Sequence, residues 1–213
     1  MSLTFYYGSG SPYAWRAWLA LEHKSIAYEL RTMSFSTGDL RKPDYLALNP
    51  RGKVPAIDDH GFTLYESVAI LEYLDETYSG SRLFPGDARA RALVLRRVQE
   101  ADQYYAVTME RLVDEVLFKA PEKWDAARIA AAREGLAKEL AMWEGLLAGT
   151  WLAGETLSAA DFTLYPLLAL TLRMEKKKPD LALRGVIGSE VAAWMQRFEA
   201  LPVCQKTWPP HWK

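Results

Sequence analysis

Up to about residue 80, short strand-like runs alternate with segments of helical periodicity. We expect strands at 3–7, 27–33, 54–57 and 62–64, and helices at 12–24, 40–47 and 67–78. In the first of these helices, Ala14, Ala17 and Leu21 recur at the three- and four-residue spacing of one helix face. The order β-α-β-α-β-β-α joins a parallel β-α-β half to an antiparallel hairpin. It predicts a mixed four-stranded sheet with helices on its faces.

Beyond this region the pattern changes to helix alone. Residues 80–86, Gly-Ser-Arg-Leu-Phe-Pro-Gly, carry the turn-forming residues of a linker between domains. No strand-like run follows, and we expect helices at 87–119, at 124–148, from residue 158 onward and at 188–200. The sequence therefore predicts an α/β domain over 1–79, a linker over 80–86 and an all-α bundle over 87–213.

Composition narrows the classes of function. The 213 residues include 26 Lys or Arg and 27 Asp or Glu, and this net charge of -1 gives no electrostatic reason to expect a nucleic-acid or membrane partner. The single cysteine, Cys204, allows no intramolecular disulfide framework, and three scattered histidines lack the spacing of a metal site. We therefore expect no metal site. Because residues 1–7 lack signal-peptide features and no apolar run approaches the roughly 20 residues of a membrane span, we expect a cytoplasmic protein.

Ser11-Pro12 is the first of three local features that can carry chemistry. Serine is a preferred N-cap and proline suits the first helical position, so Ser11 is expected where the first strand meets the first helix. The free N–H groups at that helix start favour an anion. A serine hydroxyl there can donate a hydrogen bond to a thiolate and so lower the pKa of the thiol. Ser-Pro also starts many helices without further function, and this structural interpretation stays open.

The other two features border the expected hairpin. Pro55 opens a strand, where a cis peptide bond would leave the N–H and C=O of Val54 free to pair with an extended peptide. Glu66-Ser67 opens the next helix, where Ser67 can hold a carboxylate and Glu66 an ammonium, although capping and the helix dipole explain both residues equally well. Together the three features describe a groove for a short peptide that bears a thiol and a free α-amino acid group.

At these residues the sequence resembles the soluble glutathione transferases, over essentially the whole chain. The matching stretches are 11–13, 49–55 and 64–74. The resemblance implies a thioredoxin-like N-terminal domain, an all-helical C-terminal domain, glutathione as co-substrate and a cis bond before Pro55. It implies that the Val54 backbone binds the cysteinyl unit of glutathione, that Glu66 and Ser67 hold its γ-glutamyl end, and that Lys53 contacts its glycyl carboxylate.

The resemblance also suggests how the thiol is activated. Ser11 matches the activating serine of the serine-type classes, which include theta-, zeta- and tau-like bacterial members. Tyr6 or Tyr7, at the end of the first strand, is the alternative activator, as in the tyrosine-type classes. No cysteine lies near residues 9–13, which excludes a cysteine-type site.

One further stretch departs from the family's pattern and another matches it. Leu40 stands where theta-like members often carry a basic residue, and Arg41 or Lys42 is the candidate substitute. In the helical half, residues 157–162 resemble the family's capping box, in which Ser158 and Asp161 satisfy each other's backbone donors. We expect the capping box to serve folding rather than chemistry.

The implied reaction is conjugation, in which the glutathione thiolate attacks an electrophilic small molecule in a pocket expected between the domains. The candidate pocket walls are Tyr13, Tyr104, Tyr105, Thr108, Met109 and Trp208. The resemblance further implies a homodimer. Two alternatives stay open: a glutathione-dependent isomerase, dehalogenase or peroxidase of the same fold, and a non-catalytic transferase-like binding module.

Overall fold

The computed structural model describes residues 3–147 and 149–212, which divide into two compact units. One unit comprises Met1–Pro85 together with Ala200–Lys213, and the other comprises Gly86–Glu199. The expected helical domain, 87–213, differs from this division in residues 200–213, which belong with the N-terminal unit.

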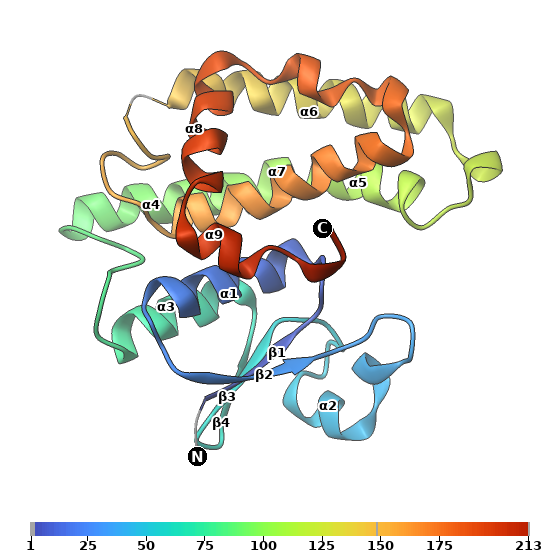
Figure 1. Cartoon of the computed structure of the whole chain (residues 1–213). Helices are drawn as coiled ribbons and strands as arrows, with labels where there is room; N and C mark the ends of the chain where they lie inside the picture. The colour runs from blue at the N-terminus through green and yellow to red at the C-terminus, as the bar shows by residue number, and fades with distance from the viewer. Residues whose placement is uncertain (1–2, 148, 213) are drawn as a thin grey trace. The chain divides into compact units, whose positions relative to one another are not determined.

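A mixed four-stranded sheet in the order β2-β1-β3-β4 forms the centre of the first unit (Figure 1). β1 (Leu3–Tyr7) and β2 (Tyr28–Thr32) pair in parallel and are joined by α1 (Pro12–His23). β3 (Ala56–Asp59) and β4 (Phe62–Tyr65) form an antiparallel hairpin, and β3 also pairs antiparallel with β1. The predicted mixed sheet is confirmed. β3 begins after Pro55, because proline has no N–H to give to the ladder.

Helices cover both faces of this sheet. α1 packs beside α3 (Ser67–Thr77) on one face, and α2 (Pro43–Leu48) lies on the other, after a 3-10 turn at Asp39–Arg41. Neighbouring strand residues point to opposite faces, so the ring of Tyr7 lies 4.7 Å from that of Trp18 in α1, while the ring of Tyr6 lies 5.7 Å from that of Tyr45 in α2. The fully buried core of this unit includes Phe5, Leu19, Leu21, Ile57, Ile70 and Leu71.

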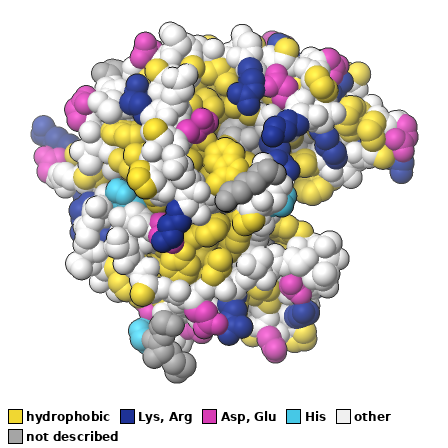
Figure 2. Space-filling model, viewed as in Figure 1, with side chains coloured by type: hydrophobic (Ala, Val, Ile, Leu, Met, Phe, Trp, Pro, Cys, Tyr) yellow, Lys and Arg dark blue, Asp and Glu magenta, His cyan; other side chains and the backbone are white. Residues whose placement is uncertain are grey.

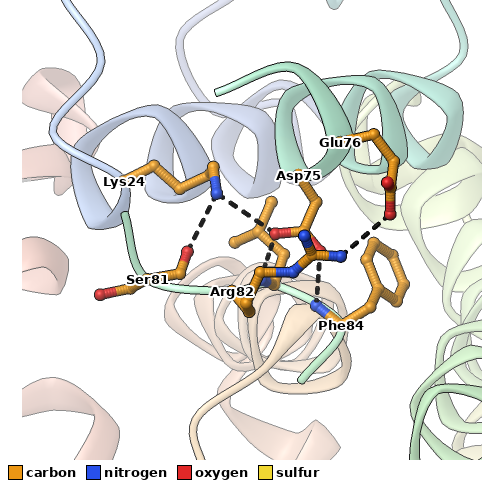
Figure 3. Close-up of polar contacts among 7 residues, drawn as sticks. Lys24, Asp75, Glu76, Ser81, Arg82 and Phe84 are labelled. Atoms are coloured by element: carbon orange, nitrogen blue, oxygen red, sulfur yellow. Dashed lines mark hydrogen bonds and ion pairs between the residues drawn. The ribbon is translucent and has the colours of Figure 1, made fainter. Parts of the chain in front are cut away.

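The predicted linker is fastened to the end of α3 by a buried carboxylate (Figure 3). Asp75 accepts hydrogen bonds from the backbone N–H groups of Leu83, at 2.7 Å, and Phe84, at 3.2 Å. Its charge is balanced by Lys24, whose Nζ lies 3.2 Å from Asp75 Oδ1 and also donates to the carbonyl oxygen of Ser81 at 3.1 Å. Asp75 is 1% exposed and Lys24 4%, so each charge depends on these partners. The segment up to Pro85 is therefore an ordered part of the first unit.

The second unit consists of helices in its described residues. Its long helices are α4 (Ala88–Glu100), α5 (Ala106–Val116), α6 (Ala126–Leu146), α7 (Ala159–Lys177) and α8 (Ser189–Glu199), with 3-10 turns at Pro121–Lys123, Pro179–Leu181 and Leu183–Val186. The single helix expected at 87–119 is interrupted by a π-helical turn, Ala101–Tyr105, between α4 and α5. The helical periodicity continues on both sides of this single turn, and the sequence analysis did not predict the turn.

Two of the candidate pocket walls lie in the core of this helical unit. Tyr105 is 0% exposed and its hydroxyl donates to Thr171 Oγ1 at 3.0 Å, while Met109 is 1% exposed. Both side chains therefore pack inside the bundle instead of lining a pocket, which is the commoner role of aromatic and apolar residues at helical spacing. Tyr104, on the same turn, is 55% exposed.

Residues 202–212 pack against α1 and so complete the first unit. They form the short helix α9 (Pro202–Thr207) and a 3-10 turn, Pro210–Trp212. The indole N–H of Trp15 donates to Thr207 Oγ1 at 2.9 Å, and the Trp15 ring meets the rings of Trp208 and Trp212 edge to face at 5.4 and 5.5 Å. The sequence did not predict α9, because six residues are too few to establish helical periodicity.

The surface carries both signs of charge. On the face shown in Figure 2, the basic and acidic side chains are interspersed over the surface. Within 3–147 and 149–212, no helix is both long and apolar enough to cross a membrane. The same residues contain no cluster of three or more His, Cys, Asp or Glu side chains arranged to hold a metal ion.

Candidate functional site

The register of the sheet brings the three predicted features to one end of it. Tyr6 of β1 pairs with Ala56 of β3, and Ala56 in turn pairs with Tyr65 of β4. The segments that follow β1 and β4 and the segment that precedes β3 therefore emerge side by side. These segments contain, respectively, Ser11, Glu66-Ser67 and Val54-Pro55.

Gly8 shows how closely two of these segments approach. A Cβ at Gly8 would lie 2.7 Å from Cγ2 of Val54 and 2.6 Å from Cζ of Phe35, so a side chain has no room there. The carbonyl oxygen of Gly8 accepts a hydrogen bond from the N–H of Ser11 at 3.1 Å, which closes a four-residue turn. Gly10, the third residue of the turn, has a φ of 87°, in the left-handed region that favours glycine. The turn that ends in Ser11 thus packs directly against Val54.

Ser11 is the N-cap of α1. Its backbone is extended, its Oγ accepts a hydrogen bond from the N–H of Ala14 at 3.2 Å, and Pro12 occupies the first helical position. A hydroxyl has two acceptor lone pairs and one proton to donate. Accepting from Ala14 therefore leaves the Ser11 proton available to a ligand. The capping role and the predicted donor role are compatible in the same side chain.

The bond between Val54 and Pro55 is cis, as the resemblance implies. Val54 lies outside β3, and within the described part of the chain its N–H and C=O form no hydrogen bond to another backbone group. These two groups remain available to an extended peptide, which pairs with a backbone as an added strand does.

The loop before Val54 is held by two residues whose role the sequence did not reveal. Asn49 is 2% exposed; its Nδ2 donates to the carbonyl oxygen of Lys53 at 2.7 Å and its Oδ1 accepts from the N–H of Arg51 at 3.0 Å. The Tyr45 hydroxyl donates to the same Lys53 oxygen at 2.5 Å, and burial raises the pKa of Tyr45 to about 12, which keeps the phenol protonated. These bonds fix the carbonyl of Lys53, and the Lys53 side chain is exposed.

Leu40 stands where theta-like members often carry a basic residue, and its backbone lies against this loop. A Cβ at Gly52 would come within 2.9 Å of the carbonyl oxygen of Leu40. Lys42 Nζ pairs with Asp39 Oδ1 at 2.6 Å. Arg41 is exposed and forms no ion pair with another described residue. Of the two candidate substitutes, Arg41 is therefore the one whose positive charge is available to a ligand.

Glu66 and Ser67 form an open start to α3. Glu66 has a φ of 71° and a ψ of 110°, a left-handed conformation that costs a residue other than glycine about 1–3 kcal/mol. Its side chain is exposed and makes no capping hydrogen bond to α3. Ser67, the first helical residue, is 8% exposed. The N–H groups of the first helical turn therefore have no side-chain acceptor from the N-cap, which is the arrangement that binds anions.

The two tyrosines at the end of β1 lie in surroundings that differ from those of Ser11. Tyr7 is 1% exposed, and burial raises the pKa of its phenol. Burial and the nearby carboxylate of Asp58 raise the pKa of Tyr6, whose side chain lies on the α2 face. Tyr7 is buried and Tyr6 lies on the α2 face, whereas Ser11 is half-buried at the start of α1, so this placement favours Ser11 over either tyrosine.

Comparison with known proteins relates this geometry to a family. The model described as the glutathione S-transferase N-terminal domain matches residues 10–77, and the model of the glutathione S-transferase C-terminal domain matches residues 109–202. Glutathione S-transferase 3 from Zea mays is 33% identical over 204 residues, covering 92% of this chain and 89% of the maize protein. The chain belongs to the glutathione S-transferase family.

Other glutathione S-transferases agree with this assignment over the whole chain. Glutathione S-transferase A from Pleuronectes platessa is 29% identical over 224 residues, covering 99% of this chain and 92% of the flatfish protein. The crystal structure of a glutathione S-transferase from the Antarctic clam Laternula elliptica superposes with a TM-score of 0.79 at 30% identity, covering 100% of this chain and 94% of the clam chain. The prediction of a glutathione transferase with a thioredoxin-like domain and a helical domain is confirmed.

Proposed function

We propose that this glutathione S-transferase ionises glutathione with Ser11 and directs the thiolate at an electrophilic small molecule. The observation that supports the proposal most strongly is the packing of the Ser11 turn against Val54. A peptide that pairs with the Val54 backbone through its cysteinyl unit places its sulfur beside the first turn of α1. The Ser11 hydroxyl, which retains its proton, lies at that helix start.

Each remaining part of glutathione has a chemically matched partner in the same unit. The γ-glutamyl carboxylate suits the open start of α3 and the hydroxyl of Ser67, and the exposed carboxylate of Glu66 suits the α-ammonium group. Lys53 is the proposed partner of the glycyl carboxylate. Arg41 supplies a second cation near the same loop.

In the proposed mechanism the enzyme supplies position and anion stabilisation. The thiol of bound glutathione releases its proton to solvent, and the resulting thiolate accepts a hydrogen bond from the Ser11 hydroxyl at the positive end of α1. The sulfur lone pair forms a bond to an electrophilic carbon, and the leaving group departs with its electron pair or the electrons move onto an acceptor within the substrate. Ser11 donates a hydrogen bond throughout and forms no covalent bond. The proposed mechanism is that of the serine-type classes, and we propose that the protein is similar to their theta-, zeta- and tau-like members.

Substitutions at Ser11 test the proposal. In Ser11→Ala both the hydroxyl and the cap are lost, whereas Ser11→Gly removes the hydroxyl but costs the cap only a few tenths of a kcal/mol. We expect both to lower kcat about 10- to 100-fold, since a hydrogen bond to a charged group contributes about 1.5–3 kcal/mol, while the Kd for glutathione changes less than threefold. Ser11→Thr, which keeps a hydroxyl, should retain most activity. A fully active Ser11→Gly would exclude Ser11 as the activator.

We further infer a homodimer in the cytoplasm. The resemblance to soluble glutathione transferases supports this inference, and exposed apolar side chains, including Leu93 in α4 and Phe62 in β4, are candidates for a subunit contact. Sedimentation equilibrium at micromolar concentration should give twice the chain mass. A monomer at these concentrations would contradict the inference.

A further inference from the structure

The 3-10 turn Pro210–Trp212 places His211 directly on the turn that ends in Ser11. His211 Nδ1 lies 2.6 Å from Ser9 Oγ, the distance of a strong hydrogen bond. A Cβ on Gly10 would lie 2.8 Å from His211 Cε1 and 3.0 Å from His211 Nε2. The imidazole therefore contacts both central residues of the turn.

The neighbouring indole determines which nitrogen of His211 carries the proton. Trp212 Nε1 lies 3.0 Å from His211 Nε2. An indole N–H only donates, so Nε2 must be the acceptor and carries no proton. In the neutral imidazole the proton is then on Nδ1, which donates to Ser9 Oγ. Ser9 accepts this bond and keeps its own hydroxyl proton.

Tryptophan packing holds His211 in this place. Trp212 is 7% exposed, and its ring lies 5.5 Å from Trp15 of α1 and 6.3 Å from Trp208. Edge-to-face pairs of this kind stabilise by about 0.5–1.5 kcal/mol each beyond the area they bury. The turn that bears His211 is thus fixed to α1, the same helix that Ser11 caps.

We propose that His211 is a positioning residue of the thiol-activating site. By donating to Ser9 it holds the turn closed by the Ser11 N–H, and so it sets where the Ser11 hydroxyl points. This role rests on the proposed function of Ser11. His211 acts through Ser9 and contacts no reacting atom in this scheme, which separates it from a catalytic base.

The role predicts a change in the thiol pKa rather than in glutathione affinity. In His211→Ala and in Ser9→Ala, the apparent pKa of bound glutathione, followed by thiolate absorbance against pH, should rise by about 0.5–1 unit. That rise lowers kcat/KM about three- to tenfold below the pKa. The Kd for glutathione should stay within twofold, and the double variant should be no worse than either single variant, because both remove the same hydrogen bond.

Two further variants separate positioning from packing. His211→Asn keeps an amide donor near the position of Nδ1 and should restore the wild-type thiol pKa at least in part. The control is His60→Ala, since the His60 side chain is 63% exposed in the turn between β3 and β4, and it should leave the thiol pKa unchanged. Thermal unfolding of each variant shows whether stability alone has changed.

The proposal is overturned if His211→Ala retains the wild-type thiol pKa, or if it loses stability while the thiol pKa stays the same. It is also overturned if ¹⁵N NMR shows the proton of His211 on Nε2. Failure of the proposed function is distinct: wild-type protein would then show no thiolate of bound glutathione. In that case the ¹⁵N spectrum would still report the contact between His211 and Ser9, while the positioning role would be rejected together with the function of Ser11.

Discussion

The starts of α3 and α7 each combine a serine with an acidic residue, and they differ in the hydrogen-bonding groups that they leave unsatisfied. At the start of α7, Ser158 is 1% exposed and Asp161 is 0% exposed. Asp161 accepts from the N–H and the hydroxyl of Ser158, from the N–H of Leu152 and from the indole of Trp194, at 2.9–3.1 Å. Every acceptor position of this carboxylate is used within the protein.

The start of α3 has the opposite character. Glu66 is exposed, has a left-handed backbone and gives no cap to the helix. The serine and the acidic residue therefore have different roles at the start of α3 and at the start of α7. A carboxylate with all its bonds made inside the protein stabilises the fold, whereas one held in a costly backbone conformation beside unsatisfied N–H groups is suited to a ligand.

The largest effect is expected from Asp161→Ala. This change removes four accepted hydrogen bonds and leaves buried donors without partners, so the free energy of unfolding should fall by about 3–5 kcal/mol. Urea unfolding followed by tryptophan fluorescence measures it. At a temperature where the variant stays folded, its Kd for glutathione should equal that of the wild type. A loss below about 1 kcal/mol would show that the network contributes little.

A smaller effect is expected at the two helix-start serines, which form a matched pair. Ser67→Ala should raise the Kd for glutathione about 10-fold, because the γ-glutamyl carboxylate loses a hydrogen bond, and should change the unfolding free energy by less than about 0.5 kcal/mol. Ser158→Ala should do the reverse, losing about 1–2 kcal/mol of stability with an unchanged Kd. Isothermal titration calorimetry measures the Kd of both variants, and urea unfolding measures their stability. If the two variants changed in the same way, the distinction between the two helix starts would be wrong.

The smallest effect is expected from relieving the backbone at Glu66. Glu66→Gly should stabilise the protein by about 0.5–1 kcal/mol, because glycine adopts a φ of 71° without strain, and should weaken glutathione binding through loss of the carboxylate. His60 has a φ of 55° in a turn with no proposed role. His60→Gly should therefore give a similar gain in stability with no change in affinity. A Glu66→Gly protein that binds glutathione as tightly as the wild type would contradict the assignment of Glu66.

The order of strands and helices was predictable because it depends on local pattern. The strand-like runs of β1 to β4 and the capping sequence at Ser158 each extend over only a few residues. Contacts between distant residues were not predictable in this way. Asp75 fastens Leu83 and Phe84 through bonds that depend on where α3 ends in space, and a turn-rich sequence gives no sign of them.

The same distinction holds within the candidate site. Ser11, Val54 and Ser67 stand at the ends of predicted elements, so the register of the sheet was enough to bring their segments together. Asn49 lies inside a recognised motif, but its role follows from a buried amide that joins two parts of one loop. His211 could not be associated with Ser9 from sequence, because 202 positions separate them.

The packing of Trp15 has a consequence for synthesis on the ribosome. Its hydrogen-bond partner Thr207 is 192 positions further along the chain, and its aromatic neighbours are further still. The nascent polypeptide therefore emerges with α1 lacking the side chains that will cover it, while more than a hundred residues of the helical unit are translated. Final maturation of the glutathione-binding half must wait until translation has passed residue 212.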